Sequence, residues 1–329
     1  MKEKMSFLKG ISILFLGCCS LLLLGRDHYL LGTSLIIFRW AIVLIGIIIL
    51  YRIFKITTLK ILRGVLFFVL LLLLVESLWY SFSQPALANV TEGVELEMMT
   101  YNVFFRNKNP LAVIRQITKR NPEILVLQEV TPKWKKTLSE QLSRVYPYNA
   151  IYIQDGTHGI ACFSKYPILS DKLLLNSNQL PFAQVLDISI KDKRLQLFNV
   201  HLASPAVAVE HPDKFMELYK ANYELRKTQL DEIMRLAKIS RNKTDAQVLI
   251  GDLNTMSFEP LYRDLNAEWV NLYSEKGEGW GLNFPNLAKV QPFVTLDYIF
   301  IRGQLQAVGA EVISGGSSDH LPVTGRVMF

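Results

Sequence analysis

Cysteine is scarce in this chain of 329 residues, and the few that are present cannot form a disulfide framework. Cys18 and Cys19 are adjacent in an apolar run, and Cys162 is the only cysteine in the rest of the chain. We interpret Cys162 as a small buried side chain of a strand. The sequence also offers no cluster of soft ligands, which argues against a metal site built on thiolates.

A basic excess is also missing from most of the chain. Residues 91–329 carry 27 Lys and Arg against 26 Asp and Glu, whereas residues 1–90 carry nine against three. Proteins that bind nucleic acid tightly usually have a clear positive excess. The nearly neutral C-terminal part therefore argues against bulk DNA binding, although it leaves room for a local basic patch.

Long hydrophobic runs are confined to residues 1–90, which we predict to form a membrane anchor. Three runs, at about 7–25, 34–51 and 64–82, each approach the roughly 20 residues that a helix needs to span a bilayer. Arg39 and Glu76 lie inside the second and third runs. They can reach the interface or, alternatively, face a polar pocket between helices.

The placement of Lys and Arg predicts the orientation of this anchor. Basic residues gather at the N-terminus and between the second and third runs, and they are rare in the other flanking segments. The positive-inside rule then places the N-terminus in the cytoplasm and the domain at residues 91–329 on the extracytoplasmic side of the cell membrane. Residues 84–89 are interpreted as a linker, and the alternative is cleavage by signal peptidase after Ala88.

The domain at residues 91–329 is long enough for one α/β core and has no internal repeats. Apolar runs and amphipathic patterns predict many short strands and three helices, which suggests two sheets packed face to face with helices outside. The predicted strands are Leu96–Asn102, Ile124–Gln128, Ile160–Ser164, Ala183–Ile190, Leu195–Leu202, Gln247–Gly251, Thr295–Ile301 and Val323–Val327. The predicted helices are Pro110–Arg120, Pro132–Val145 and Lys214–Ile239, the last burying Leu218, Leu225, Leu230, Ile233, Met234 and Leu236.

Short polar motifs stand beside several of these apolar runs. Side chains at strand ends can meet in one site although they are distant in sequence. Together they supply hard oxygen ligands, two histidines and a spare carboxylate, the set that a Mg²⁺-dependent phosphoester hydrolase needs. The motifs are TYNV (Thr100–Val103), LQEV (Leu127–Val130), NVHL (Asn199–Leu202), GDLN (Gly251–Asn254), LDY (Leu296–Tyr298) and SDHLP (Ser318–Pro322).

Asn102, Glu129 and His201 each stand at the end of an apolar strand. Glu129 can bind a hard divalent cation, and Asn102 can supply a neutral oxygen or orient a water. His201 can donate to a phosphate oxygen that gains charge. The alternative for Asn102 and Glu129 is a cap or turn former, and for His201 a structural histidine.

Asp252 and Asn254 are expected to project to one side of an extended segment. Asp252 can orient or deprotonate the attacking water, and Asn254 can hold that water or the phosphate oxygens. The alternative is an Asp/Asn turn. Asp297 and His320 are expected to pair, because a buried carboxylate raises the basicity of an imidazole. His320 would then be protonated and face the phosphate.

In this order, the motifs resemble the endonuclease/exonuclease/phosphatase superfamily of DNase I-like folds, over about Glu95–Phe329. The resemblance implies a four-layer α/β sandwich and one or two Mg²⁺ or Mn²⁺ ions. It implies that Asp252 activates water and that Asn254 contacts the scissile phosphate, although members of the family differ over the true base. The residues carried over by motif are Asn102, Glu129 and Asp319 for the metal, and His201, Asp252, Asn254, Asp297 and His320 for catalysis.

Two further segments resemble parts of this family. His158 matches a loop that borders the phosphate pocket and would bind substrate, and the alternative is a solvated loop histidine. Residues 279–285 resemble a membrane-tethered bacterial subgroup that includes the teicoplanin-resistance membrane proteins.

The expected function is a membrane-anchored, divalent-metal-dependent phosphoester hydrolase with an extracytoplasmic active site. Its expected partners are the lipid bilayer and a phosphate ester, preferably lipid or lipid-linked, with no obligate protein partner. The alternative is a tethered or released nuclease. For it, five basic residues could flank a nucleic-acid backbone, although a solvated helix face explains them equally well: Arg106, Lys108, Arg115, Lys119 and Arg120. A remote alternative is an inactive binding module, which would have lost a metal or water-activating residue, and none is lost here.

Overall fold

A computed structural model describes residues 10–19, 45–49, 51–52, 61, 64–71, 93–257 and 259–329. The chain divides into two compact units. The first comprises Met1–Ser83 and Phe258–Asp264, and the second comprises Gln84–Ser257 and Leu265–Phe329.

The described part of residues 1–83 is helical and apolar. Ile49, Leu66 and Leu70 form a small buried cluster in it. No helix among the described residues is long and apolar enough to cross a membrane. Each of the spans predicted at 7–25, 34–51 and 64–82 extends beyond the described residues, so the predicted membrane anchor lies partly outside them.

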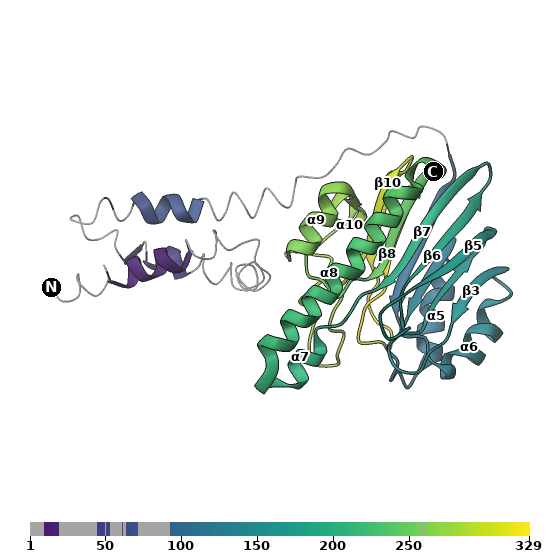
Figure 1. Cartoon of the computed structure of the whole chain (residues 1–329), viewed down its shortest axis with the longest axis horizontal. Helices are drawn as coiled ribbons and strands as arrows, with labels where there is room; N and C mark the ends of the chain where they lie inside the picture. The colour runs from purple at the N-terminus through teal and green to yellow at the C-terminus, as the bar shows by residue number, and fades with distance from the viewer. Residues whose placement is uncertain are drawn as a thin grey trace. The chain divides into compact units, whose positions relative to one another are not determined.

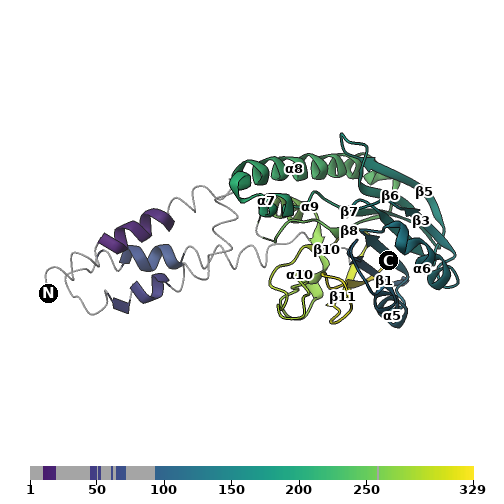
Figure 2. The same cartoon turned by 90° about the horizontal axis from the view of Figure 1, so that it is seen from below.

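The second unit contains two six-stranded sheets. Figures 1 and 2 show how the sheets lie among the helices. Each sheet has one parallel pair at its centre, β1 with β2 in the first and β7 with β8 in the second, and all its other neighbours are antiparallel. The first sheet runs β11 (Gln306–Val312), β12 (Val323–Met328), β1 (Glu95–Asn102), β2 (Ile124–Gln128), β4 (Ile160–Ser164), β3 (Tyr148–Tyr152). The second runs β5 (Ile168–Leu175), β6 (Pro181–Ile190), β7 (Lys193–His201), β8 (Ala246–Asp252), β10 (Asp297–Gly303), β9 (Val270–Asn271).

An apolar core lies between the two sheets, because alternate residues of each strand point inward. Met98 and Val126 from the first sheet and Leu197, Val248 and Ile250 from the second are fully buried members of this core. The central strands β2 and β8 are buried along their whole length. Burial on both faces means that further layers must cover the outer sides of the sheets.

Helices supply these outer layers (Figures 1 and 2). Trp134 and Leu138 of α6 and Ile117 of α5 join Leu125 and Phe163 of the first sheet in a second buried cluster. On the other side, α8 hydrogen bonds with β8. The result is an α/β sandwich of two sheets between helices, the architecture predicted from the sequence. The helices are α5 (Pro110–Arg120), α6 (Pro132–Leu142), α7 (Ala206–Glu210), α8 (Phe215–Ser240), α9 (Pro260–Glu268) and α10 (Leu272–Lys276), with 3-10 turns at Pro212–Lys214 and Arg241–Lys243.

All eight predicted strands are present, with ends shifted by two residues at most. The three predicted helices are also present, although α6 ends at Leu142 rather than Val145. Four strands were not predicted, namely β3, β5, β9 and β11, and they are the outermost strands of the two sheets.

The buried face of α8 differs from the predicted one. Leu230 and Ile233 are buried as expected, but Leu225 is exposed. Arg226 and Gln229, which were not among the predicted core residues of this helix, are also buried. The prediction of Leu225 as a core residue was therefore wrong, because hydrophobicity alone did not determine which face of this helix is covered.

Candidate active site

Asp252, the last residue of β8, lies at the centre of a cluster of polar side chains. Its Oδ1 accepts a hydrogen bond of 2.8 Å from the backbone N–H of Asn254. Its Oδ2 accepts one of 3.0 Å from Asn102 Nδ2 and lies 3.7 Å from His201 Nε2 and 3.8 Å from His320 Nε2. One carboxylate oxygen is therefore fixed by the backbone, while the other faces three nitrogen donors.

Asn102 and Glu129 come from the parallel pair at the centre of the first sheet. Because β1 and β2 are parallel, their carboxyl ends meet at the same edge, and Asn102 Nδ2 donates to Glu129 Oε1 over 3.1 Å. Glu129 follows β2 with a left-handed backbone (φ 64°), and its Oε2 accepts from the N–H of Phe105 over 2.8 Å. A left-handed non-glycine residue is strained, and such strain concentrates at functional sites.

His201 occupies the equivalent position in the second sheet. It is the last residue of β7 and is paired in register with Asp252 across the parallel β7–β8 ladder. Its Nε2 lies 3.9 Å from Glu129 Oε1, so it stands between carboxylates from both sheets. Its side chain is buried.

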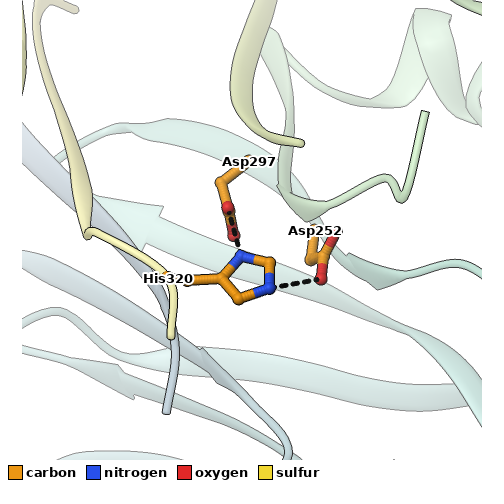
Figure 3. Close-up of side chains that lie close together, drawn as sticks. All are labelled: Asp252, Asp297 and His320. Carbon is orange, nitrogen blue, oxygen red and sulfur yellow. Dashed lines mark hydrogen bonds and ion pairs between the residues drawn. The ribbon is translucent and has the colours of Figure 1, made fainter. Parts of the chain in front are cut away.

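Asp297 and His320 form the pair expected from the sequence, with His320 Nδ1 2.7 Å from Asp297 Oδ2 (Figure 3). Burial by itself lowers the pKa of His320, but the carboxylates of Asp297 and Asp252 raise that pKa to about 10. Burial raises the pKa of Asp297 to about 6, while the charge of His320 lowers it. At neutral pH the pair is therefore an imidazolium and a carboxylate, and the second ring nitrogen points toward Asp252.

Asn254 does not continue an extended segment, contrary to the sequence-based expectation. Its backbone is left-handed (φ 48°), and its N–H closes a turn onto the side chain of Asp252. Its Nδ2 donates to the carbonyl of Leu202 over 3.0 Å. The Asp/Asn turn that the sequence left open is therefore present, and it connects the ends of β7 and β8.

Asp319 and His158 lie at the margin of the cluster. Burial raises the pKa of Asp319, with further effects from the charges of His320, Glu129 and Asp252. The ring of His158 hydrogen bonds through Nδ1 with the carbonyl of Pro181 over 3.3 Å. Burial lowers the pKa of His158, and the charges of His201 and Glu129 also affect it, so this ring lies near the cluster without bonding to it.

Two positioning residues escaped the sequence analysis. Ser318 Oγ donates to the carbonyl of Asn102 over 2.6 Å and accepts from the N–H of His320 over 3.2 Å. Asn283 Nδ2 donates to the carbonyl of Asp297 over 2.9 Å, and its own carbonyl accepts from the N–H of Leu321. The SDHLP motif did contain Ser318, and Asn283 lies within the segment 279–285 that the sequence analysis singled out without giving Asn283 a role.

Two sets of side chains have the chemistry to hold a divalent cation. Glu129, Asn102 and Asp319 offer only oxygen ligands, and each oxygen that accepts a hydrogen bond keeps a second lone pair. Asp252, Asp297 and His320 also place potential ligand atoms within 4.8 Å of one another.

Solved structures confirm the fold at low sequence identity. Truncated TDP2 from Caenorhabditis elegans is 19% identical, with a TM-score of 0.56, over 71% of this chain and 98% of that one. TDP2 from D. rerio, in complex with a single-strand DNA product, is 15% identical, with a TM-score of 0.57, over 71% and 99%. A protein of the endonuclease/exonuclease/phosphatase group from Bacteroides vulgatus is 17% identical, with a TM-score of 0.57, over 72% and 99%.

Sequence comparison gives the family directly. No curated protein sequence matches the chain significantly. The model of the endonuclease/exonuclease/phosphatase family, however, matches residues 99–320, which is more than half of the chain and includes every predicted site residue from Asn102 to His320. Members of this family are metal-dependent phosphoester hydrolases. The chain therefore belongs to the endonuclease/exonuclease/phosphatase family.

Proposed function

We propose that this protein is a membrane-anchored phosphoester hydrolase that depends on Mg²⁺ or Mn²⁺ and acts outside the cytoplasm on a lipid or lipid-linked phosphate. The observation that carries the hydrolase assignment is the arrangement around Asp252. This carboxylate is held by the backbone on one side and faces two imidazoles on the other. Such a group can orient a water and take its proton as the water attacks phosphorus.

His320 and His201 would stabilise the charge that develops on the phosphate. Asp297 holds His320 in one orientation and keeps it protonated, so that His320 Nε2 can donate to a phosphate oxygen. His201 Nε2 reaches the same space from β7. A cation held by Glu129, Asn102 and Asp319 would neutralise further charge on the phosphate and on the leaving oxygen.

Exposed aromatic side chains beside the site support a lipid substrate. Phe284 packs on the ring of His320, with ring centroids 4.7 Å apart. On the same segment, Trp280 is 83% exposed and Phe293 is 64% exposed. Exposed aromatic side chains near a pocket are typical of surfaces that contact a membrane or a partner. The three predicted spans would tether the domain to the bilayer.

A nuclease is the second candidate, and one feature favours it. The backbone N–H of Phe105 donates to Glu129, and the guanidinium of Arg106 lies 4.8 Å from the centroid of the Phe105 ring. An aromatic ring and a cation beside a metal site can stack a base and bind a phosphate. The DNA product bound to the D. rerio protein is a precedent within the same fold.

Substrate assays with the full-length protein in detergent would separate the two candidates. The panel contains phospholipids, a lipid-linked pyrophosphate and single-stranded DNA, each with Mg²⁺, with EDTA, and with the Asp252→Asn variant. We expect the wild-type protein to hydrolyse lipid with Mg²⁺, and we expect both EDTA and the Asp252→Asn substitution to abolish this hydrolysis. Hydrolysis of DNA alone would make the protein a nuclease, and no metal-dependent hydrolysis of any ester would refute the proposed function.

Loss of the exposed aromatic side chains tests the lipid assignment. We expect Trp280→Ser with Phe293→Ser to reduce hydrolysis of vesicle lipid but not of a small soluble phosphodiester. Leu169→Ser is a matched control, because Leu169 is 58% exposed on β5, four strands away from β10 in the same sheet. An equal loss on both substrates would contradict a role in lipid contact.

The location and the domain boundary near residue 90 are tested separately. Alkaline phosphatase fused after Phe329 is active only outside the cytoplasm, so we expect activity from this fusion. Size analysis of the membrane-bound protein shows whether cleavage after Ala88 occurs. An inactive fusion that is stably expressed would refute the proposed orientation.

A further inference from the structure

Two buried polar side chains project from α8 toward the loops that carry the catalytic residues. Arg226 is fully buried and Gln229 nearly so. Residues three apart in a helix lie on the same face, so both point to one side of α8. Apolar side chains would cover the sheet with less loss of hydration. Burial of these two polar groups therefore needs an explanation in the hydrogen bonds that they make.

Gln229 holds the loop that leaves β7. Its Oε1 accepts a hydrogen bond of 2.9 Å from the backbone N–H of Ala203, two residues after His201. A buried backbone N–H without an acceptor is unfavourable. Gln229 supplies an acceptor for the Ala203 N–H at the point where the hydrogen bonds of β7 to its neighbouring strands have ended.

Arg226 holds the loop that leaves β8. Its Nη1 donates to the carbonyl of Asn254, two residues after Asp252, and to the hydroxyl of Thr255 over 3.1 Å. The carbonyl belongs to a residue with a left-handed backbone, a conformation that needs support from its surroundings. A charged donor makes a stronger hydrogen bond to a carbonyl than a neutral one.

The two loops are also bonded to each other. The N–H of Leu202 donates to the carbonyl of Asp252 over 3.0 Å, and Asn254 Nδ2 donates back to the carbonyl of Leu202 over 3.0 Å. With the contacts from α8, these bonds form a closed network around the ends of β7 and β8. The bonded residues follow His201 and Asp252 directly in the chain, and the side chains of these two approach to 3.7 Å.

We propose that Arg226 and Gln229 are positioning residues that hold His201 and Asp252 in their relative geometry. They act through the two loops. This inference rests on the proposed hydrolase function for its kinetic readout, whereas its structural readout does not depend on it. A misplacement of about 1 Å can reduce turnover about 100-fold, so a network of this kind is significant for catalysis.

Paired variants of Gln229 test the proposal in the full-length protein in detergent. Gln229→Met keeps the volume and removes the acceptor, whereas Gln229→Glu keeps an oxygen that can accept from Ala203. We expect Gln229→Met to lower kcat about 10- to 100-fold with little change in KM, and Gln229→Glu to recover most of it. Gln247→Met is the matched control, because Gln247 is a buried glutamine that bonds to Ala237 near the far end of α8.

Hydrogen exchange supplies a readout that does not need activity. We expect the Ala203 amide to exchange faster in Gln229→Met than in wild type, and to stay protected in Gln229→Glu and in Gln247→Met. If the wild-type protein hydrolyses no ester, the proposed function fails, yet this measurement still tests the network. An unchanged Ala203 amide in Gln229→Met would overturn the inference, as would an equal kcat loss in the Gln247→Met control.

Arg226 is tested by Arg226→Lys, which keeps the charge but has a shorter side chain with a single donor group. In Arg226→Lys we expect the backbone amides of residues 252–256 to exchange faster than in wild type. We expect kcat to fall as well, but by less than in Arg226→Met. If Arg226→Met does not fold, Arg226→Lys alone decides. Wild-type kcat together with wild-type exchange in Arg226→Lys and in Gln229→Met would refute a positioning role.

Discussion

Replacement of Asp252 by asparagine keeps the shape of the side chain but places an amide N–H₂ where the carboxylate offers only acceptors and its two hydrogen-bond partners are donors. Oδ1 accepts from the N–H of Asn254 and Oδ2 accepts from Asn102 Nδ2. Whichever way the new amide is oriented, its nitrogen therefore faces another donor in a buried position. The charge that faces the two imidazoles is lost as well.

The structure sets the expected size of both effects. A buried donor without an acceptor costs about 1–3 kcal/mol of folding free energy. At about 2–4 °C per kcal/mol, this lowers the melting temperature of a domain of this size by roughly 2–12 °C. Loss of a general base lowers kcat about 10²- to 10⁴-fold. Activity should therefore fall far more than the loss of stability can explain.

Asp245→Asn is the matched control for this variant. Asp245 directly precedes β8, whereas Asp252 ends it, and Asp245 also accepts a backbone N–H, from Arg194 over 2.8 Å. Strand geometry of about 3.3 Å per residue separates the two by roughly 23 Å. An asparagine there keeps its oxygen on Arg194 and can turn its nitrogen to solvent, so kcat should not change.

The assay measures kcat and the melting temperature of the full-length protein with excess Mg²⁺, on the ester that the wild type hydrolyses. Asp252→Asn should lose turnover while it remains folded. If Asp252→Asn retained activity within about tenfold of the Asp245→Asn control, Asp252 would not be the group that activates water.

Three further changes probe the core, the backbone and the metal. Trp134→Ala should lower the free energy of unfolding by about 3–5 kcal/mol in a urea titration, because a fully buried indole leaves a cavity. The exposed neighbour change Lys135→Ala should stay within about 0.5 kcal/mol. Gly251→Ala should cost about 3 kcal/mol or more, since φ is 140° and a Cβ would lie 2.1 Å from the carbonyl of Val200. Glu129→Gln should raise the Mg²⁺ concentration for half-maximal activity at least about tenfold.

Each of these has a result that would contradict it. A small loss in Trp134→Ala would mean that α6 does not anchor the outer face of the first sheet. Wild-type stability in Gly251→Ala would show that the end of β8 can move away from β7. An unchanged Mg²⁺ dependence in Glu129→Gln, measured by titration after EDTA treatment, would place the cation elsewhere.

The sequence predicted the interior of the sheets better than their edges. The central strands β2 and β8 are buried along their whole length, so their apolar runs are visible without any structure. The edge strands β3 and β5 are mostly exposed and carry mixed side chains. Their strand conformation comes from hydrogen bonds to the neighbouring strand, and a linear pattern of hydrophobicity does not contain that information.

The face of α8 illustrates the same limit. Its amphipathic pattern predicted the helix and most of its length, but not the burial of Arg226 and Gln229. These polar residues are buried because loops from two other strands supply acceptors and a donor. Partners of that kind are distant in sequence, and a local pattern does not reveal them.

The sequence by itself determined which chemical groups the site contains, since the motifs supply carboxylates, amides and imidazoles beside apolar strands. Only the tertiary structure decided that these groups meet. Each sheet has one parallel pair at its centre, and the carboxyl ends of both pairs lie at the same place, so Asn102 and Asp252 come within 3.0 Å although they are 150 residues apart. The physical reason is that strand direction and register, rather than local sequence, determine which strand ends face one another.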